Sequence, residues 1–227
     1  ISGRVVKALS YGKHTAMGEF NTEQSLNSIT LQDIKDGYEK YITPSRSYLT
    51  FIGDITPAQA KSLAEKAFGD WKGNTLVLPT IANVANPAQT EIDLVDVPSA
   101  VQSEITVTNL VNLPMSSPDF FPVLLANQIL GGGSGRLYQN LREKHGFTYG
   151  SYSSIGPGRY QTTFSATAQV RNEKVDSAVV EILKEINRIR TEKVSDKELA
   201  ETKALYSGNF ALGLENPAVP ATFASNI

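Results

Sequence analysis

Apolar residues recur at helical spacing near the start of the chain. Thr30 and Asp33 form a pair that typically begins a helix, because each side chain can accept a hydrogen bond from a free backbone N–H of the first turn. Ile34, Tyr38 and Tyr41 follow at intervals of about one helical turn, which places them on one face. The pattern predicts an amphipathic helix that ends before the next proline.

A short apolar run and a second helix follow. Residues 47–53, Ser-Tyr-Leu-Thr-Phe-Ile-Gly, are rich in aromatic and β-branched side chains and predict a buried strand. Thr56 and Pro57 favour a new helix start, since proline suits the first helical position. The inner face of this helix is formed by Leu63, Ala64, Ala67 and Phe68. We expect residues 1–72 to be the end of an α/β unit whose other strands are missing or come from residues 1–11.

Residues 73–90 carry neither a helical nor an alternating pattern. Gly73, Pro79 and Pro87 interrupt them, and charged side chains are few. Such spacing of turn-forming residues is typical of a connection between two folded parts. The sequence predicts a linker here, followed by a second domain over residues 91–227 that is truncated at its C-terminal end.

The second domain contains four segments with strand character. Residues 91–97 and 102–110 alternate apolar and polar side chains, as half-buried strands do. Residues 149–155 and 160–170 have the same character and flank Gly156-Pro157-Gly158, a sequence that favours a turn. The last two segments are therefore predicted to form a β-hairpin.

Helical patterns lie between and after these strands. A helix is predicted to start at Ser117-Pro118-Asp119, and a shorter one spans residues 136–145. Residues 173–190 form an amphipathic helix, and Ser195 with Glu198 begins the last helix. The apolar stripe of the amphipathic helix is Val175, Val179, Ile182, Ile186 and Ile189. Its charges predict a solvated face, formed by Glu181, Lys184, Glu185, Arg188 and Arg190. Strands and helices in blocks predict an α+β fold, with helices packed on one face of a mainly antiparallel sheet.

Composition narrows the function classes. The 227 residues carry a net charge of −2, so the chain presents no basic field that would attract nucleic acid. The absence of cysteine excludes disulfides, cysteine-ligated zinc and a cysteine nucleophile. No apolar run approaches the roughly 18 residues that a membrane span needs. The Ser, Thr and Asn content and the missing cysteine favour an exported, periplasmic bacterial protein without fixing the compartment.

Candidate chemistry is concentrated in residues 130–149, where a helix end, a glycine turn, a short helix and a strand are predicted in that order. Arg142 and Tyr149 lie on either side of a chain reversal, so their polar ends can converge on one point. Two such donors suit a carbonyl oxygen that becomes negative in a transition state, or a carboxylate or carbonyl of a bound peptide. From the spacing alone, an exposed helical arginine and a strand tyrosine packed on the core are the more ordinary interpretation.

The glycine-rich stretch, residues 131–135, raises the question of a phosphate-binding loop. It matches neither G-x-G-x-x-G nor G-x-x-x-x-G-K-[ST], and it follows a helix rather than a strand. A flexible hinge is therefore the simpler interpretation.

Three parts of residues 130–149 resemble the second-domain signature of the insulinase/pitrilysin zinc metallopeptidases: Gly-Gly-Gly-Ser-Gly-Arg-Leu, Leu-Arg-Glu-Lys and Gly-Phe-Thr-Tyr. Residues 11–54 resemble the end of that family's first domain, through Tyr-Gly-Lys-His, Ser-Ile-Thr-Leu-Gln-Asp, Tyr-Ile-Thr-Pro and Gly-Asp. The resemblance covers nearly the whole chain and implies the repeated metalloprotease-like fold of that family.

The resemblance also implies roles for particular residues. Arg142 and Tyr149 would hold a peptide substrate near its scissile bond, and the peptide would add to a sheet edge as an extra strand. Four neighbouring residues would lie near the peptide backbone: Gly131, Gly132, Gly133 and Ser134. In the family, zinc is held by an H-x-x-E-H motif and a downstream Glu of a catalytic domain, and the Glu of the motif activates the bound water.

The zinc motif is absent from this chain. Its two histidines, His14 and His145, are far apart and neither is followed or preceded by a Glu-His pair. We therefore expect no metal ligand and no catalytic residue here, and no activity of the segment alone. The zinc would lie in a catalytic domain upstream in the same full-length chain or on a partner subunit. The predicted role is the substrate-binding, non-zinc-binding part of a zinc-dependent endopeptidase.

Two other functions fit the same residues. The chain can be a non-catalytic scaffold or partner subunit of the same fold, although retention of the Arg/Tyr pair favours the peptidase hypothesis. It can also be a module that binds peptides without hydrolysing them.

Overall fold

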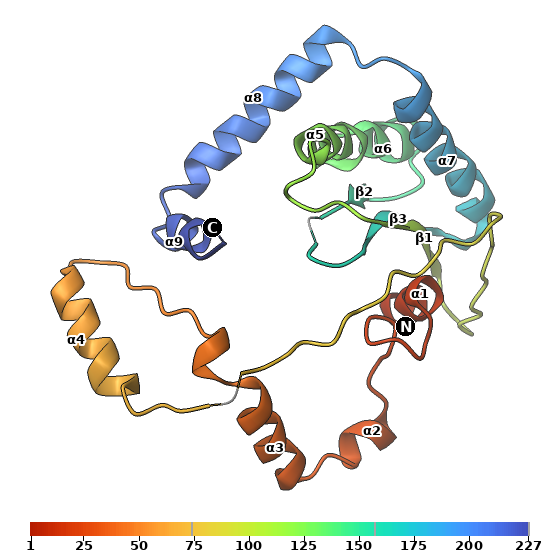
Figure 1. Ribbon diagram of the computed structural model, residues 1–227. Helices are drawn as coiled ribbons and strands as arrows, with labels where there is room; N and C mark the ends of the chain where they lie inside the picture. The colour runs from red at the N-terminus through yellow and green to blue at the C-terminus, as the bar shows by residue number, and fades with distance from the viewer. Residues whose placement is uncertain (74, 157, 227) are drawn as a thin grey trace. The chain divides into compact units, whose positions relative to one another are not determined.

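The computed structural model describes residues 1–73, 75–156 and 158–226 (Figure 1). The chain forms two compact units. Unit 1 comprises residues 1–20 and 81–206, and unit 2 comprises residues 21–80 and those from 207 onward.

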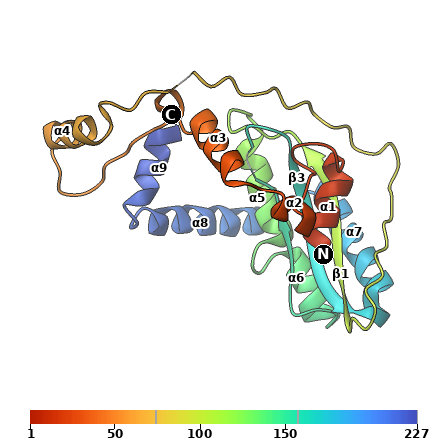
Figure 2. The same cartoon turned by 90° about the horizontal axis from the view of Figure 1, so that it is seen from below.

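Unit 1 is built on a three-stranded antiparallel sheet of order β1-β3-β2. The strands are β1 (Gln102–Val111), β2 (Ser151–Ser154) and β3 (Thr162–Arg171). Figure 2 shows β1 and β3 side by side, and their register runs from Gln102 opposite Arg171 to Val111 opposite Thr162. The predicted hairpin is confirmed as the β2–β3 pair; Pro157, which was expected in its turn, lies outside the described residues.

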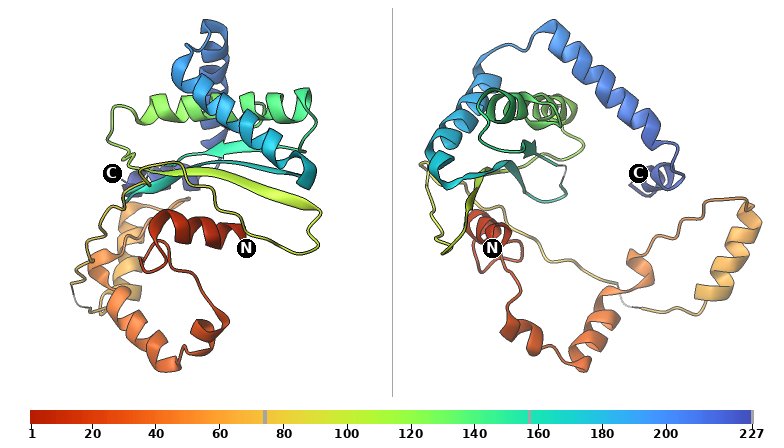
Figure 3. Two further views of the ribbon diagram at one scale, coloured as in Figure 1. Left: turned by 90° about the vertical axis from the view of Figure 1, so that its right-hand side faces the viewer. Right: turned by 180° about the vertical axis from the view of Figure 1, so that it is seen from behind.

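Helices of unit 1 cover one face of this sheet (Figure 3). They are α5 (Phe120–Gly131), α6 (Arg136–Tyr138), a π-helix η2 (Gln139–Lys144) and α7 (Val175–Thr191), which follows a 3₁₀ turn η3 (Asn172–Lys174). Helix α1 (Ser2–Tyr11) contacts β1 and lies below the sheet in the left view of Figure 3. The predicted α+β fold, with helices on one face of an antiparallel sheet, is confirmed.

The core of unit 1 forms where these helices meet the sheet. Leu137 and Leu141 are fully buried, and Ile182 of α7 is buried beside them. Strand β3 contributes alternate side chains, as a half-buried strand must: Ala166, Ala168 and Val170. Burial of a large aliphatic side chain contributes about 1.5–3 kcal/mol, so this cluster stabilises the position of the helices over the sheet.

Unit 2 consists of short helices joined by extended chain. They are α2 (Glu23–Asn27), α3 (Leu31–Tyr41), a 3₁₀ turn η1 (Pro44–Arg46), α4 (Pro57–Phe68) and α9 (Ala218–Asn226). The predicted starts of α3 and α4 are confirmed, since Thr30 and Thr56 each form a capping box with the residue three positions later. Helix α8 (Asp196–Gly213) begins in unit 1 and continues into unit 2.

Two predicted strands are wrong. Residues 47–53 and 91–97 have no regular secondary structure, and neither segment belongs to a sheet of the described chain. Their apolar side chains are open to solvent, with Tyr48 at 84% and Leu94 at 88% exposure. A strand needs a neighbour for its backbone N–H and C=O groups, and no described strand lies alongside either segment.

The short helix predicted over residues 136–145 is correct in position but not in type. Only Arg136–Tyr138 is α-helical, and Gln139–Lys144 continues as a π-helix. In this wider turn the His145 N–H donates to Asn140 O at 3.2 Å, five residues back. Sequence periodicity does not distinguish these helix types, because both carry their buried residues at similar spacing.

Candidate functional site

The glycine turn before α6 is held closely against the sheet. Gly131 is the last residue of α5 and is buried; a Cβ there would meet the backbone N and the side chain of Ser153 in β2. At Gly132 a Cβ would meet the Gln128 side chain. A Cβ at Gly133 would meet no atom within 4 Å, and both Gly133 and Ser134 are exposed. The turn is therefore packed at its first residue and open at its third and fourth.

The helical segment after this turn is fixed by both apolar and polar contacts. Leu137 and Leu141 have no exposed surface, and Asn140 between them is 6% exposed. The Asn140 Nδ2 donates to Glu181 Oε2 and to Glu185 Oε1 of α7, each at 2.8 Å. These contacts join the π-helix to α7.

Arg142 lies on the accessible side of this π-helix. Its side chain is 45% exposed, and its guanidinium carbon lies 5.0 Å from the centre of the Tyr138 ring. Its Nε is 3.6 Å from Glu143 Oε1, a pair exposed on both sides and therefore worth little. The guanidinium thus keeps donors available to a ligand while its stem is held over an aromatic ring.

Tyr149 lies in the segment between the π-helix and β2. Gly146 permits the chain reversal, with a φ of 63°, and Tyr149 itself is 86% exposed. Its hydroxyl has no hydrogen-bond partner among the described residues. Arg142 and Tyr149 share no hydrogen bond or ring contact in the described chain, so each is presented to solvent separately.

A second polar contact, which sequence reasoning missed, joins α6 to α8. The Arg136 Nε and Nη2 donate to the two carboxylate oxygens of Glu198 at 2.9 and 2.7 Å. The Arg136 hydrogen bond lowers the pKa of Glu198, and the Glu198 carboxylate raises the pKa of Arg136. The predicted capping box is only half formed. Ser195 Oγ accepts a hydrogen bond from the Glu198 N–H at 3.2 Å, but the Glu198 side chain accepts hydrogen bonds from Arg136 rather than from the Ser195 N–H.

A cavity of ≈ 640 Å³ lies beside this ion pair, between α5, α6, η2, α7 and the first part of α8. Basic side chains such as Lys144 and Arg188 line it together with an equal number of acidic ones, including Glu192 and Glu201. Because most of these charges pair with one another, the lining selects neither an anion nor a cation.

The predicted solvated face of α7 is partly wrong. Glu185 is 5% exposed and Glu181 keeps only 15% of its side-chain surface, because both face Asn140 of the π-helix. The signal was present in the sequence, because Glu185 lies three positions after Ile182 and four before Ile189, on the edge of the apolar stripe. What the sequence did not show was a buried amide that could hydrogen-bond both carboxylates.

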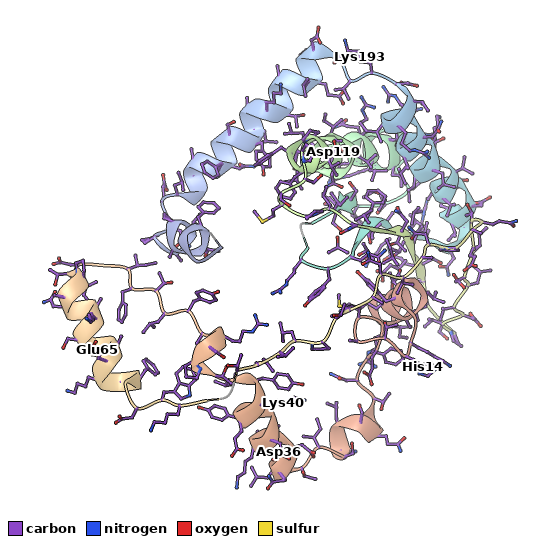
Figure 4. The ribbon with its side chains drawn as sticks, viewed as in Figure 1. His14, Asp36, Lys40, Glu65, Asp119 and Lys193 are labelled. Carbon is purple, nitrogen blue, oxygen red and sulfur yellow. The ribbon has the colours of Figure 1, made fainter. Side chains whose placement is uncertain are left out.

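The residues that the structure describes do not fit a zinc site. No three His, Cys, Asp or Glu side chains among them lie close enough to hold a metal ion. His14 is exposed in the turn after α1 (Figure 4). His145 stacks on Phe147 at 4.9 Å, and its Nε2 is 3.8 Å from Glu181 Oε2, which is too long for a hydrogen bond. Within the described chain, no helix has the length and apolar character to cross a membrane.

Comparisons with known proteins identify relatives of this arrangement. A sequence profile of the peptidase M16 inactive domain matches residues 28–206. An uncharacterised zinc protease of Bacillus subtilis, YmxG, is 24% identical over 212 residues, which are 91% of this chain and 50% of that protein. An uncharacterised zinc protease of Rickettsia felis is 27% identical over 205 residues, covering 86% of this chain and 46% of the relative.

Solved structures give the same result. A peptidase M16 inactive domain from Pseudomonas fluorescens superposes with a TM-score of 0.82 at 25% identity, over 91% of this chain and 50% of that one. A protease from Helicobacter pylori shares the fold, with a TM-score of 0.79 at 19% identity, over 90% and 51% of the two chains. The chain spans about half the length of the curated relatives that it matches. By the match over residues 28–206, this chain belongs to the peptidase M16 inactive domain family.

Proposed function

We propose that this chain is the substrate-binding, non-zinc-binding part of a zinc-dependent endopeptidase. The observation that carries the proposal is the presentation of Arg142 and Tyr149. Both are accessible polar side chains within the part of the chain that matches the family, and Arg142 stands on a helix fixed by a buried core. Zinc and the base that activates water are supplied by a catalytic domain in the same full-length chain or on a partner subunit.

Each side chain has a distinct task in this proposal. The Arg142 guanidinium donates to a carbonyl oxygen of an extended peptide, and the Tyr149 hydroxyl donates to the carbonyl of the bond under attack as negative charge develops. Both side chains act only as hydrogen-bond donors in these roles. Their separate exposure means that a peptide lying between them would complete the site.

The glycine turn extends the proposed site. Gly133 and Ser134 are exposed, and the absence of side-chain atoms at Gly133 leaves room for a peptide backbone to approach. Gly131 anchors the turn to β2, and the Gly132 N–H and C=O are bonded to Gln128 O and to the Gly135 N–H. We therefore assign the backbone contacts with the peptide to Gly133 and Ser134, with Gly131 and Gly132 holding the turn in place.

Peptide turnover by the full-length protein tests the proposal. Tyr149→Phe should lower kcat/KM for a fluorogenic peptide by about 100- to 1,000-fold, the range found when one transition-state donor is removed. Arg142→Ala removes a charged donor to the substrate and should lower it by about 10- to 100-fold. Arg171→Ala and Tyr48→Phe are matched controls. The Arg171 side chain is 60% exposed against 45% for Arg142, and Tyr48 is 84% exposed against 86% for Tyr149.

The control variants should retain wild-type turnover. If Arg142→Ala and Tyr149→Phe also turn over peptide at the wild-type rate, the proposed substrate role is wrong. A full-length protein without any zinc-dependent peptidase activity would instead support the scaffold hypothesis for this chain.

A further inference from the structure

The π-helix that carries Arg142 is held by an unusual polar contact. A π-helix is rare in proteins, appears mostly as a single turn within an α-helix, and is frequent at functional sites. Here the wide turn closes with the His145 N–H on Asn140 O, and the Gly146 N–H donates to Arg142 O at 2.9 Å. The direction of Arg142 therefore depends on what fixes this turn.

Asn140 supplies the polar part of that restraint. Its amide nitrogen has two hydrogens, and each goes to a different carboxylate one turn apart on α7: Glu181 Oε2 and Glu185 Oε1, both at 2.8 Å. Hydrogen bonds to carboxylates are stronger and more directional than neutral ones. Two of them from one planar group fix the rotation of the helix about its axis as well as its position.

The carboxylates are themselves held in place. Lys184 Nζ lies 3.3 Å from Glu181 Oε2, and Arg188 Nη1 lies 3.4 Å from Glu185 Oε2. His145 reaches the same Glu181 oxygen at 3.8 Å. The Asn140 hydrogen bond, more than the nearby cations, keeps the pKa of Glu181 below its ordinary value, so this carboxylate stays charged as an acceptor. Asn140 thus meets two carboxyl acceptors whose own positions are set by α7.

This contact costs free energy that an apolar residue would avoid. The Asn140 Oδ1 is buried without a hydrogen-bond partner among the described residues, and Glu185 is almost fully buried. Burying an unpartnered amide oxygen is unfavourable, and the two carboxyl groups that Asn140 contacts are themselves costly to bury. A buried polar contact of this kind gives little net stability over an apolar one, so its contribution is better explained by geometry.

We propose that Asn140, through its two hydrogen bonds to Glu181 and Glu185, is the positioning residue for Arg142. The proposal rests on the substrate role proposed above for Arg142. Asn140 sets the turn of the π-helix, and the Arg142 side chain then extends from the opposite side of that turn over the Tyr138 ring.

A double-mutant cycle in the full-length protein tests this directly. Asn140→Leu should lower kcat/KM for a peptide at least tenfold. In an Arg142→Ala background the same change should alter kcat/KM by less than twofold, because the residue acts through Arg142. The control for general destabilisation of the α7 contact is Ile182→Val or Ile182→Ala, chosen to match the melting temperature of Asn140→Leu. This control should retain turnover near the wild-type value.

The proposal is overturned if Asn140→Leu costs no more activity than the stability-matched control, or if its effect is the same with and without Arg142. Should Asn140→Leu not fold, Glu181→Leu removes one of the two acceptors at a partly exposed position and enters the same cycle, with the same expected outcomes.

A second readout separates this proposal from the proposed function. The Arg142 Nε–Hε resonance in the NMR spectrum should be shifted by the Tyr138 ring in the wild type and in the control. In Asn140→Leu it should move towards the value of an unrestrained arginine. An unmoved resonance contradicts the positioning role. If Arg142→Ala leaves peptide turnover unchanged while this resonance moves, the substrate role fails and the positioning role stands.

Discussion

Unit 1 and unit 2 carry similar amphipathic patterns but bury them to very different extents. In unit 1 the apolar faces of α6, η2 and α7 meet the sheet, and Leu137, Leu141 and Ile182 are fully buried. In unit 2, Thr43 alone is buried among the residues whose burial is described. The apolar face predicted for α3 is more than half exposed at Ile34 and Tyr38.

The difference shows what an amphipathic pattern does and does not predict. The periodicity of α3 and α4 correctly predicts helices and their capped starts, because helix formation depends on neighbours in sequence. It does not say whether the same chain supplies the surface that covers the apolar face. In unit 1 the chain covers the apolar helix faces itself, through long-range contacts with β1 and β3. In unit 2 the described residues leave the apolar face of α3 open.

The largest effect that tests this contrast comes from matched leucine truncations. Leu137→Ala in unit 1 should lower the free energy of unfolding by about 2–5 kcal/mol, because it leaves a cavity in a fully buried site. Leu63→Ala in α4, where the side chain is 52% exposed, should change it by about 0.5 kcal/mol. Chemical denaturation of the 227-residue chain measures both. Equal losses would mean that the α4 face is covered.

A pair of glycine substitutions tests the packed and open ends of the turn after α5. Gly131→Ala should cost about 1–3 kcal/mol of unfolding free energy, since a Cβ would collide with Ser153 and force the helix end away from β2. Gly133→Ala meets nothing within 4 Å and should stay within about 0.5 kcal/mol of the wild type. A tolerated Gly131→Ala would contradict the close helix–strand contact.

The Arg136–Glu198 pair should contribute less than the apolar core. Glu198→Gln should cost about 1–2 kcal/mol, a value reduced because a third of the Glu198 side chain is in contact with solvent. Glu192→Gln is the control, because the Glu192 side chain is 61% exposed in its pair with Arg188, and it should cost at most about 0.5 kcal/mol.

The pH dependence gives the same pair a second test. Because folding lowers the pKa of Glu198, its stabilisation is present above the ordinary carboxyl pKa of 4.5 and is lost as the pH falls below that value. The difference in unfolding free energy between wild type and Glu198→Gln should therefore shrink between neutral pH and pH values below 4.5. A difference that stays constant in acid would show that the ion pair does not form.

The smallest effect should be confined to unit 2. Thr30→Ala removes the hydroxyl that accepts from the Asp33 N–H at 3.2 Å, so hydrogen exchange of the first α3 amides should quicken about fivefold. Thr30→Ser keeps the acceptor and should exchange as the wild type does. Exchange in β3 should be the same in all three proteins, and a change there would show that α3 is coupled to the core of unit 1.

Much of the fold followed from local pattern. The hairpin, α7 and the starts of α3 and α4 were predicted, since alternation, periodicity and capping residues act over a few positions. The wrong strands at residues 47–53 and 91–97 have strand-like sequences, but a strand also needs a neighbour that local sequence does not specify.

The candidate site also contains residues that the local sequence predicts and residues that it does not. The family signature in the sequence points to Arg142 and Tyr149, and their role stays a prediction. Asn140, its two carboxylates and the Arg136–Glu198 pair were missed, because their partners lie 41 to 62 positions away along the chain. Glu185 in particular was placed on a solvated face, although its partner buries it.

Peptide affinity of the full-length protein, measured with its metal removed, tests the central claim most directly. Without turnover, fluorescence anisotropy of a labelled extended peptide reports binding alone. Arg142→Ala combined with Tyr149→Phe should raise the dissociation constant by about 10- to 100-fold relative to wild type, mainly through loss of the charged Arg142 donor, with a smaller part from the Tyr149 hydroxyl. The Arg171→Ala, Tyr48→Phe control should bind as the wild type does. Equal affinity of the two double variants would contradict the assignment of this chain as the part that holds the substrate.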